Sequence, residues 1–177
     1  MYISEKFEDG ILEKIRLLYE SSFPKEEKKP FSLMLKKRDE GLMRFFSILS
    51  EDGELLGFML TVHHGRITLL DYFAIEPASR CKGVGSLALS ELLKEYPYGS
   101  VVVEIEDERI PSSDQDLRIR RKNFYLRSGL KIMPYNVSLY GVKMRVLTSG
   151  QDIPFEEYRA LYREVFGEKA EKNVILL

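Results

Sequence analysis

The sequence predicts a mixed α/β fold whose sheet begins as an antiparallel meander and includes one parallel crossover. Two glycine-containing turns, Asp52-Gly53 and His64-Gly65, separate three strand-like segments, as in successive hairpins. A strand, a helix and another strand then follow between residues 67 and 106, an order that implies a parallel pair joined by a right-handed crossover. Segments with helical periodicity occur before, between and after the strands, so helices are expected on both faces of the sheet.

The N-terminal third supplies two helices and the meander. Gly10 to Ser22 has an apolar face typical of a helix, Asp9 is its expected N-cap, and Pro24 ends it. A charged connector over Pro24 to Pro30 leads to a short helix over Phe31 to Glu40. The three strands of the meander are expected at Arg44 to Ser50, Leu55 to Val62 and Ile67 to Ile75. The third is almost entirely apolar, which is typical of a central strand.

The crossover helix is predicted over Gly83 to Tyr96 and leads to a buried strand over Ser100 to Glu106. Its buried face is expected to consist of Val84, Leu87, Ala88, Leu92 and Tyr96. A further helix follows the N-cap residues Ser112, Ser113 and Asp114, runs to Ser128 and has Gly129 as its C-cap. Two strands, Leu130 to Met133 and Ser138 to Leu147, and a helix over Pro154 to Phe166 complete the expected order.

Length and composition indicate one globular domain over residues 1–177. The long predicted helices and strands lie within 10–166, which is the expected core, and 167–177 is a C-terminal tail. The net charge of −1 argues against a nucleic-acid partner. One cysteine excludes an internal disulfide, and no apolar run reaches the roughly 20 residues that span a bilayer. We therefore expect a cytoplasmic protein without a membrane partner. The apolar end of the tail is expected to pack on the domain or on a second subunit, so a homodimer is left open.

The most informative local pattern is the turn between the third strand and the crossover helix. It consists of Arg80, Cys81, Lys82, Gly83, Val84, Gly85 and Ser86. Two glycines at this spacing let successive backbone N–H groups point into one concavity at a helix N-terminus, where an anion such as a pyrophosphate binds. The alternative is that both glycines only permit a tight turn, but the two flanking cations favour a phosphate ligand. His63 and His64 point to opposite faces of a strand, and no cluster has the spacing of metal ligands, so no metal is expected.

Two phosphate-containing ligands fit the turn. Gly83 to Ala88 matches the dinucleotide fingerprint, and Glu104 lies where an acid would bind a ribose, so an NAD(P)-dependent oxidoreductase is one alternative. In that motif, however, the first glycine follows its strand almost at once, whereas Glu76 to Lys82 intervene here. The other ligand is coenzyme A.

The turn and the strand before it resemble the central motif of the GNAT superfamily of N-acetyltransferases. The similarity covers Leu70 to Pro77 followed by Arg80-x-x-Gly83-x-Gly85, and Asn123 to Leu130 is similar to the family's second motif. The resemblance extends over residues 10–166 and implies acetyl-CoA as co-substrate. It further implies that the backbone of Phe73, Ala74 and Ile75 pairs with the pantetheine arm. The N–H groups of residues 81–86 would hold the pyrophosphate, and Arg80 and Asn123 join the expected cofactor-binding set.

In the same resemblance, Tyr125 matches the general acid that protonates the leaving thiolate, although a core aromatic is the alternative role. The ordinary pKa of a phenol, near 10, suits an alkyl thiol. A base must take the proton of the attacking amine, and Asp71, Glu104 and Glu106 lie on the two strands that flank the thioester in the family. Asp71 and Glu104 are the preferred candidates, acting directly or through a water.

Two charged segments are interpreted as surface. Glu106 to Glu108 is expected to be a solvated strand end, although an acidic mouth that attracts an amine is an alternative. The basic run Arg118 to Lys122 is expected to be an exposed face, with a contact to the 3′-phosphate as the alternative. The sequence departs from the family here, because Arg118 stands where many members have an Asn that touches the pantetheine.

The overall hypothesis is an N-acetyltransferase that moves an acetyl group from acetyl-CoA directly to a primary amine in a ternary complex. The acceptor is expected to be a small molecule or a peptide, and no motif identifies it. Besides the oxidoreductase, a GNAT-like module that binds acyl-CoA without catalysis remains an alternative.

Overall fold

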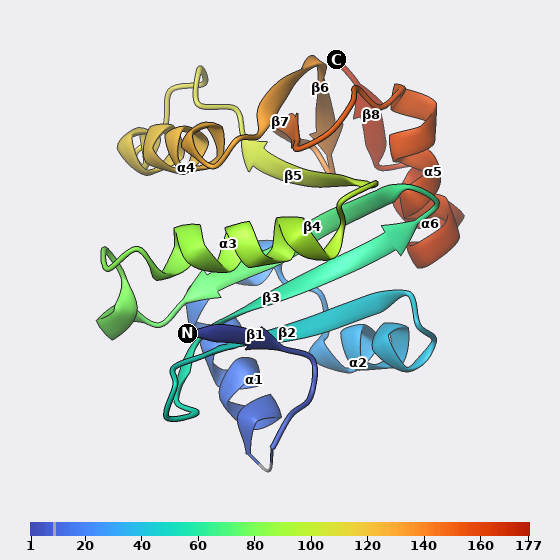
Figure 1. Cartoon of the computed structure of the whole chain (residues 1–177). Helices are drawn as coiled ribbons and strands as arrows, with labels where there is room; N and C mark the ends of the chain where they lie inside the picture. Colours follow the sequence, from blue (N-terminus) through green and yellow to red (C-terminus); the bar gives the residue numbers. More distant parts are fainter. Residues whose placement is uncertain (9) are drawn as a thin grey trace. The chain divides into compact units, whose positions relative to one another are not determined.

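A computed structural model describes residues 1–8 and 10–177. Asp9, the expected N-cap of the first helix, lies outside the described residues. The strands are β1 (Tyr2–Ser4), β2 (Met43–Leu49), β3 (Leu55–His64), β4 (Ile67–Ile75), β5 (Ser100–Glu106), β6 (Lys131–Leu139), β7 (Val142–Thr148) and β8 (Val174–Leu176). The helices are α1 (Ile11–Ser22), α2 (Phe31–Asp39), α3 (Val84–Glu95), α4 (Gln115–Arg127), α5 (Phe155–Phe166) and α6 (Glu168–Glu171) (Figure 1).

The strands are hydrogen-bonded in the order β1-β2-β3-β4-β5-β7-β6-β8. β4 pairs with β5 in parallel, whereas the β1–β2, β2–β3, β5–β7, β6–β7 and β6–β8 pairs are antiparallel. This mixed sheet confirms the predicted fold class, including the parallel pair and the central place of the apolar strand β4. The chain divides into two compact units, one of Met1–Val62 with Leu70–Glu95 and one of His63–Leu69 with Tyr96–Leu177.

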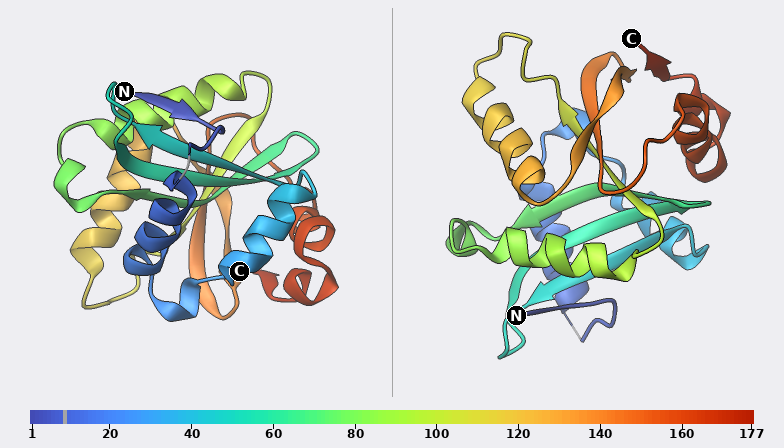
Figure 2. Two further views of the ribbon diagram at one scale, coloured as in Figure 1. Left: turned by 90° about the horizontal axis from the view of Figure 1, so that it is seen from below. Right: turned by 45° about the horizontal axis from the view of Figure 1, so that its top comes forward.

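In the first unit, helices cover both faces of the sheet: α1 and α2 lie on one face and α3 on the other (Figures 1 and 2). The Tyr19 ring of α1 is fully buried and meets Tyr72 of β4 edge-on, with ring centroids 4.9 Å apart. Phe31 of α2 packs against Phe45 of β2 at 6.0 Å. The contact of Tyr19 follows from the apolar face that predicted α1.

One prediction about α3 is wrong. Its buried side chains are Ala88, Leu89 and Leu92, while Leu87 is 57% exposed. At about 100° per residue, a face centred on these three residues leaves Leu87 nearly opposite and brings Gly85 onto the packed side.

The second unit corrects the predicted C-terminal strands. Instead of strands over 130–133 and 138–147, β6 runs through Pro134, and the hairpin turn lies at Tyr140-Gly141. Both turn residues have positive φ, 49° and 87°, as a two-residue hairpin loop requires. Pro134 fits within β6 because the register with β7 shifts between Ile132 and Asn136. A tyrosine gives no sequence signal for such a turn.

The tail packs on its own unit. After α6, β8 pairs with β6, with Leu139 opposite Val174 and Val137 opposite Leu176. The tail was expected to pack either on the domain or on a second subunit, and these residues pack on the domain. In the same unit, the parallel pairing of β4 with β5 covers Ile67–Leu69 and Ser100–Val102.

Candidate functional site

The turn before α3 has the backbone that anion binding requires. Cys81 and Gly83 both have positive φ, 59° and 80°, and residues of this kind alternating with right-handed ones direct successive N–H groups to one side. The first helical hydrogen bond of α3 runs from Leu87 N to Gly83 O. The amides of residues 84–86 therefore belong to the first turn, where helix N–H groups have no intrahelical acceptor. Helix N-termini with such amides, together with the helix dipole, are places where phosphate-type anions bind in proteins.

The side chains around this turn are accessible. Arg80, Cys81, Lys82 and Ser86 are exposed, and a Cβ added at Gly83 would meet nothing within 4 Å. Arg80 Nε donates to the carbonyl of Ile75 at 3.0 Å, so this side chain is held at the end of β4. A cation at that place adds to the positive potential of the helix N-terminus.

At the end of β4, the backbone approaches β3 closely. A Cβ at Gly57 would lie 2.4 Å from the carbonyl oxygen of Ala74, so only glycine fits there. Glu76 N donates to Leu56 O at 2.8 Å, which continues the contact beyond the strand. The segment Phe73–Ile75, expected to pair with the pantetheine arm, is thus held from its β3 side.

Asp71 is engaged in an ion pair. Lys29 Nζ lies 2.8 and 2.9 Å from its two carboxylate oxygens, and the Asp71 side chain is only 5% exposed. The hydroxyl of Tyr72 accepts from Lys29 N and donates to Glu27 O, which further ties the connector before α2 to β4. The sequence left two options for this carboxylate, pairing or lining a cavity, and the structure shows it paired. Lys29 carried no sequence signal as its partner.

We expect Lys29→Met to lower the free energy of unfolding by about 2 kcal/mol, because Asp71 would remain buried without its cation. Because Lys29 is 24% exposed, the expected loss of unfolding free energy is smaller than for a fully buried ion pair. Lys36→Met is the control: this largely exposed lysine pairs with Glu40 at 3.9 Å and should cost less than about 0.5 kcal/mol. Urea unfolding measures both, and equal losses would contradict the role given to the Lys29–Asp71 pair.

Glu104 is held by two hydroxyl groups from α5. Tyr158 and Tyr162 both donate to its Oε1, the latter at 2.6 Å. Burial, followed by the charge of Glu104, raises the pKa of Tyr158 well above its usual value, so this phenol stays a proton donor. These neutral donors stabilise the charge of the carboxylate without cancelling it. The spacing of the tyrosines predicted that they point inward, but nothing in the sequence paired them with Glu104.

Tyr125 lies in the last turns of α4 and is buried, with its ring 5.0 Å from that of Phe124. Burial raises the pKa of its hydroxyl to about 12, while the charge of Arg121 acts in the opposite direction. The phenol therefore remains protonated across the physiological range. Asn123, two residues earlier, is partly buried on the same helix.

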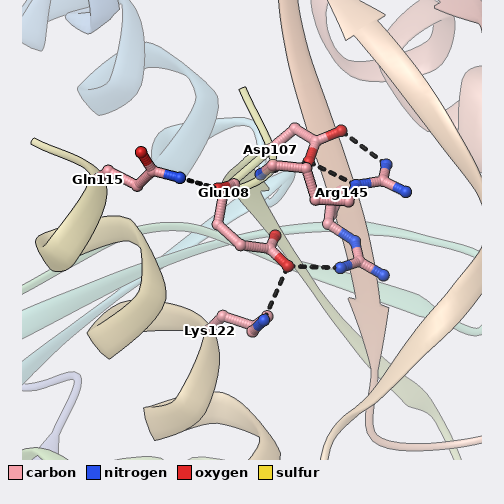
Figure 3. Close-up of polar contacts among 6 residues, drawn as sticks. Asp107, Glu108, Gln115, Lys122 and Arg145 are labelled. Carbon is pink, nitrogen blue, oxygen red and sulfur yellow. Dashed lines mark hydrogen bonds and ion pairs between the residues drawn. The ribbon is translucent and has the colours of Figure 1, made fainter. Parts of the chain in front are cut away.

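The interpretation of Glu106 to Glu108 as a solvated strand end is wrong, whereas Arg120 and Arg121 of the basic run are exposed, as expected. Asp107 and Glu108 are buried, and Glu106 pairs with Arg118 at 2.7 Å and with Arg121 at 3.2 Å. The hydrogen bonds of Arg109 hold the pKa of Asp107 at about 2. Burial alone would raise the pKa of Glu108, but the hydrogen bond from Lys122 and the charge of Arg145 bring it below its usual value. The acids and bases neutralise each other (Figure 3).

The described residues contain no group of three or more His, Cys, Asp or Glu side chains that could hold a metal ion. None of the helices they form has both the length and the apolarity needed to cross a membrane. The class that the fold defines is a mixed α/β protein in which α3 begins at a glycine-containing turn lined by backbone amides.

Comparison with known proteins identifies the family. Residues 12–105 match the family model described as the acetyltransferase (GNAT) family, and the chain belongs to that family. No curated protein matches the sequence.

Solved structures have the same fold at low sequence identity. A GNAT-family protein from Bacteroides thetaiotaomicron is 19% identical, with a TM-score of 0.76 over 97% of this chain and 99% of its own. An aminoglycoside 6′-N-acetyltransferase complexed with coenzyme A is 18% identical, with a TM-score of 0.67 over 87% of this chain and 98% of its own. The spermidine N-acetyltransferase of Vibrio cholerae, complexed with CoA and spermine, is 14% identical, with a TM-score of 0.64 over 83% and 93%.

Proposed function

We propose that the protein is an N-acetyltransferase that moves the acetyl group of acetyl-CoA directly to a primary amine in a ternary complex. The observation that carries the proposal is the amide-lined turn before α3, which lies within the residues that match the family. Its N–H groups, from Cys81 to Ser86, would bind the pyrophosphate of the co-substrate. The family membership favours coenzyme A over the dinucleotide that the same glycine spacing allows.

The chemistry assigned to this chain needs an oxyanion donor, a base and an acid. A backbone N–H near Ile75 would stabilise the oxyanion that forms when the amine attacks the thioester. Tyr125 would donate its proton to the departing thiolate, and its burial keeps that proton available. Glu104 is the better supported base, because both oxygens of Asp71 already bind Lys29.

The acceptor class follows from the base and from the neighbours. A carboxylate attracts an ammonium group by its charge and can take a proton from the amine, directly or through a water. Two structural neighbours are named for amine acceptors, spermidine and an aminoglycoside. We therefore propose a small-molecule or peptide amine as the acceptor.

Calorimetric titration with acetyl-CoA and with NAD(H), followed by thiol-release assays over a panel of amines, tests the proposal. We expect acetyl-CoA to bind, NAD(H) not to bind, and thiol release to require an amine. Tight binding of NAD(H) without binding of acetyl-CoA would overturn the proposal. Binding of acetyl-CoA without turnover of any amine would instead support a non-catalytic acyl-CoA-binding module.

A further inference from the structure

The helix that carries Tyr125 is anchored to the end of β5 through a buried carboxylate. Glu108, which follows β5, is 6% exposed, and its Oε1 lies 2.8 Å from Lys122 Nζ of α4. The same oxygen lies 2.7 Å from Arg145 Nη1 of β7 (Figure 3). One buried oxygen thus joins a helix to a strand.

The other polar atoms of Glu108 and Arg145 add no hydrogen bond to this anchor, so it is sensitive to the loss of either cation. Glu108 Oε2 and Arg145 Nε are both buried, and neither has a hydrogen-bond partner among the described residues. The contacts of the carboxylate to its two cations are therefore concentrated on Oε1. In a medium of low dielectric constant, such charge-assisted contacts are strong and hold their partners in a defined geometry.

Further contacts bind other turns of α4. Gln115 Nε2 donates to the backbone carbonyl of Glu108 at 3.0 Å, and Arg118 binds Glu106 at 2.7 Å. Gln115, Arg118, Lys122 and Tyr125 follow one another at intervals of three, four and three residues. This spacing places them in one row along a helix. The first three members are held at the end of β5, and Tyr125 is the fourth.

We infer that Glu108 is a positioning residue for Tyr125: by holding Lys122, it fixes the rotation of α4 and hence the direction of the Tyr125 side chain. The inference rests on the proposed function, in which Tyr125 is the general acid. Reacting groups misplaced by about 1 Å lose on the order of 100-fold in rate, so a small turn of the helix has a measurable effect.

The chain supplies a matched pair of variants for the test. Lys122 and Arg145 contact the same oxygen at nearly the same distance, and their side chains are 21% and 16% exposed, but only Lys122 lies on α4. We expect Lys122→Met to lower kcat about tenfold and to leave KM for acetyl-CoA within twofold. Arg145→Met should lower the melting temperature by a similar amount and leave kcat within twofold of the native value. Lys122→Arg, which keeps the contact, should retain most of the activity.

Three results would overturn the inference. Equal losses of kcat in the Lys122→Met and Arg145→Met variants would indicate a general structural role. A raised KM for acetyl-CoA in Lys122→Met, absent with acetyl-dephospho-CoA as donor, would show that Lys122 contacts the cofactor. Should Lys122→Met fail to fold, Gln115→Ala removes an uncharged contact of the same row and should lower kcat about threefold; an unchanged kcat would refute the inference.

A second readout separates this inference from the proposed function. Hydrogen exchange of the amides of residues 119–127 should be faster in Lys122→Met than in Arg145→Met, whether or not Tyr125 takes part in catalysis. If Tyr125→Phe has full activity while the exchange result holds, the catalytic role of Tyr125 fails and the anchoring of α4 stands. Unchanged exchange in both variants would refute the anchoring itself.

Discussion

Tyr125→Phe should lower kcat by about 100-fold, with the affinity for acetyl-CoA nearly unchanged, as expected for the loss of a general acid. The substitution removes one oxygen from a side chain that is already buried, so the fold should persist. Without the phenol, the thiolate must leave unprotonated or take its proton from water. Single-turnover and steady-state rates, together with calorimetric titration of acetyl-CoA, measure the two effects separately.

The same residue makes a prediction about pH. The hydroxyl must be protonated to act as an acid, and burial raises its pKa to about 12. The wild-type kcat should therefore show no alkaline decrease due to Tyr125 up to pH 10.5, about 1.5 units below that pKa. Tyr98→Phe is the control, because Tyr98 is fully exposed and its replacement should change neither kcat nor its pH profile.

An unchanged kcat in Tyr125→Phe would remove Tyr125 from the mechanism.

The predictable part of the fold depends on interactions between residues near in sequence. The turn at Asp52-Gly53 and the periodicity of α1 and α5 are local signals, and the corresponding elements lie where they were predicted. The turn at Tyr140-Gly141 is different, because a tyrosine rarely adopts positive φ and only the pairing of β6 with β7 places it there. β1 and β8 were missed for a similar reason: three residues each, they exist through their partners β2 and β6.

The candidate site also has one part that is contiguous in sequence and another that depends on contacts between distant residues. The turn from Arg80 to Ser86 is contiguous, so its glycines and cations could be recognised together. Asp71 and Lys29 are 42 residues apart, and Glu104 is 54 residues from Tyr158, so these contacts depend on the tertiary fold. The sequence identified Asp71 as unusual in an apolar strand, which is a statement about desolvation. It could not identify Lys29 as its partner, nor the two tyrosines that bind Glu104.

The charged segments show that the exposure of a charge run cannot be predicted from that run alone. Acids from Glu106 to Glu108 and bases from Arg118 to Lys122 are each typical of a solvated surface when considered alone. In the structure, α4 and the end of β5 are joined by pairs between the two runs, Glu106 with Arg118 and Glu108 with Lys122. The basic run nevertheless keeps an exposed part at Arg120 and Arg121.

Gly83→Val should weaken the binding of acetyl-CoA by about 100-fold or more, which corresponds to the loss of two hydrogen bonds to a charged group. Gly83 has φ of 80°, and a β-branched residue in this conformation costs roughly 1–2 kcal/mol. No atom lies within 4 Å of the added Cβ, so the effect comes from the backbone and not from a clash. A valine would move residue 83 to negative φ and turn the N–H groups of Val84 and Gly85 away from the anion.

Gly53→Val is the control variant, because it introduces similar backbone strain at a turn other than the one before α3. Gly53 has φ of 81°, has nothing within 4 Å of its added Cβ, and lies in the hairpin turn between β2 and β3. Its substitution should lower the melting temperature about as much as Gly83→Val does, while the Kd for acetyl-CoA stays within twofold of the native value. Retention of native affinity in Gly83→Val would refute the pyrophosphate assignment. An equal loss of affinity in both variants would mean that strain anywhere in this unit, and not the orientation of the turn's N–H groups, determines binding.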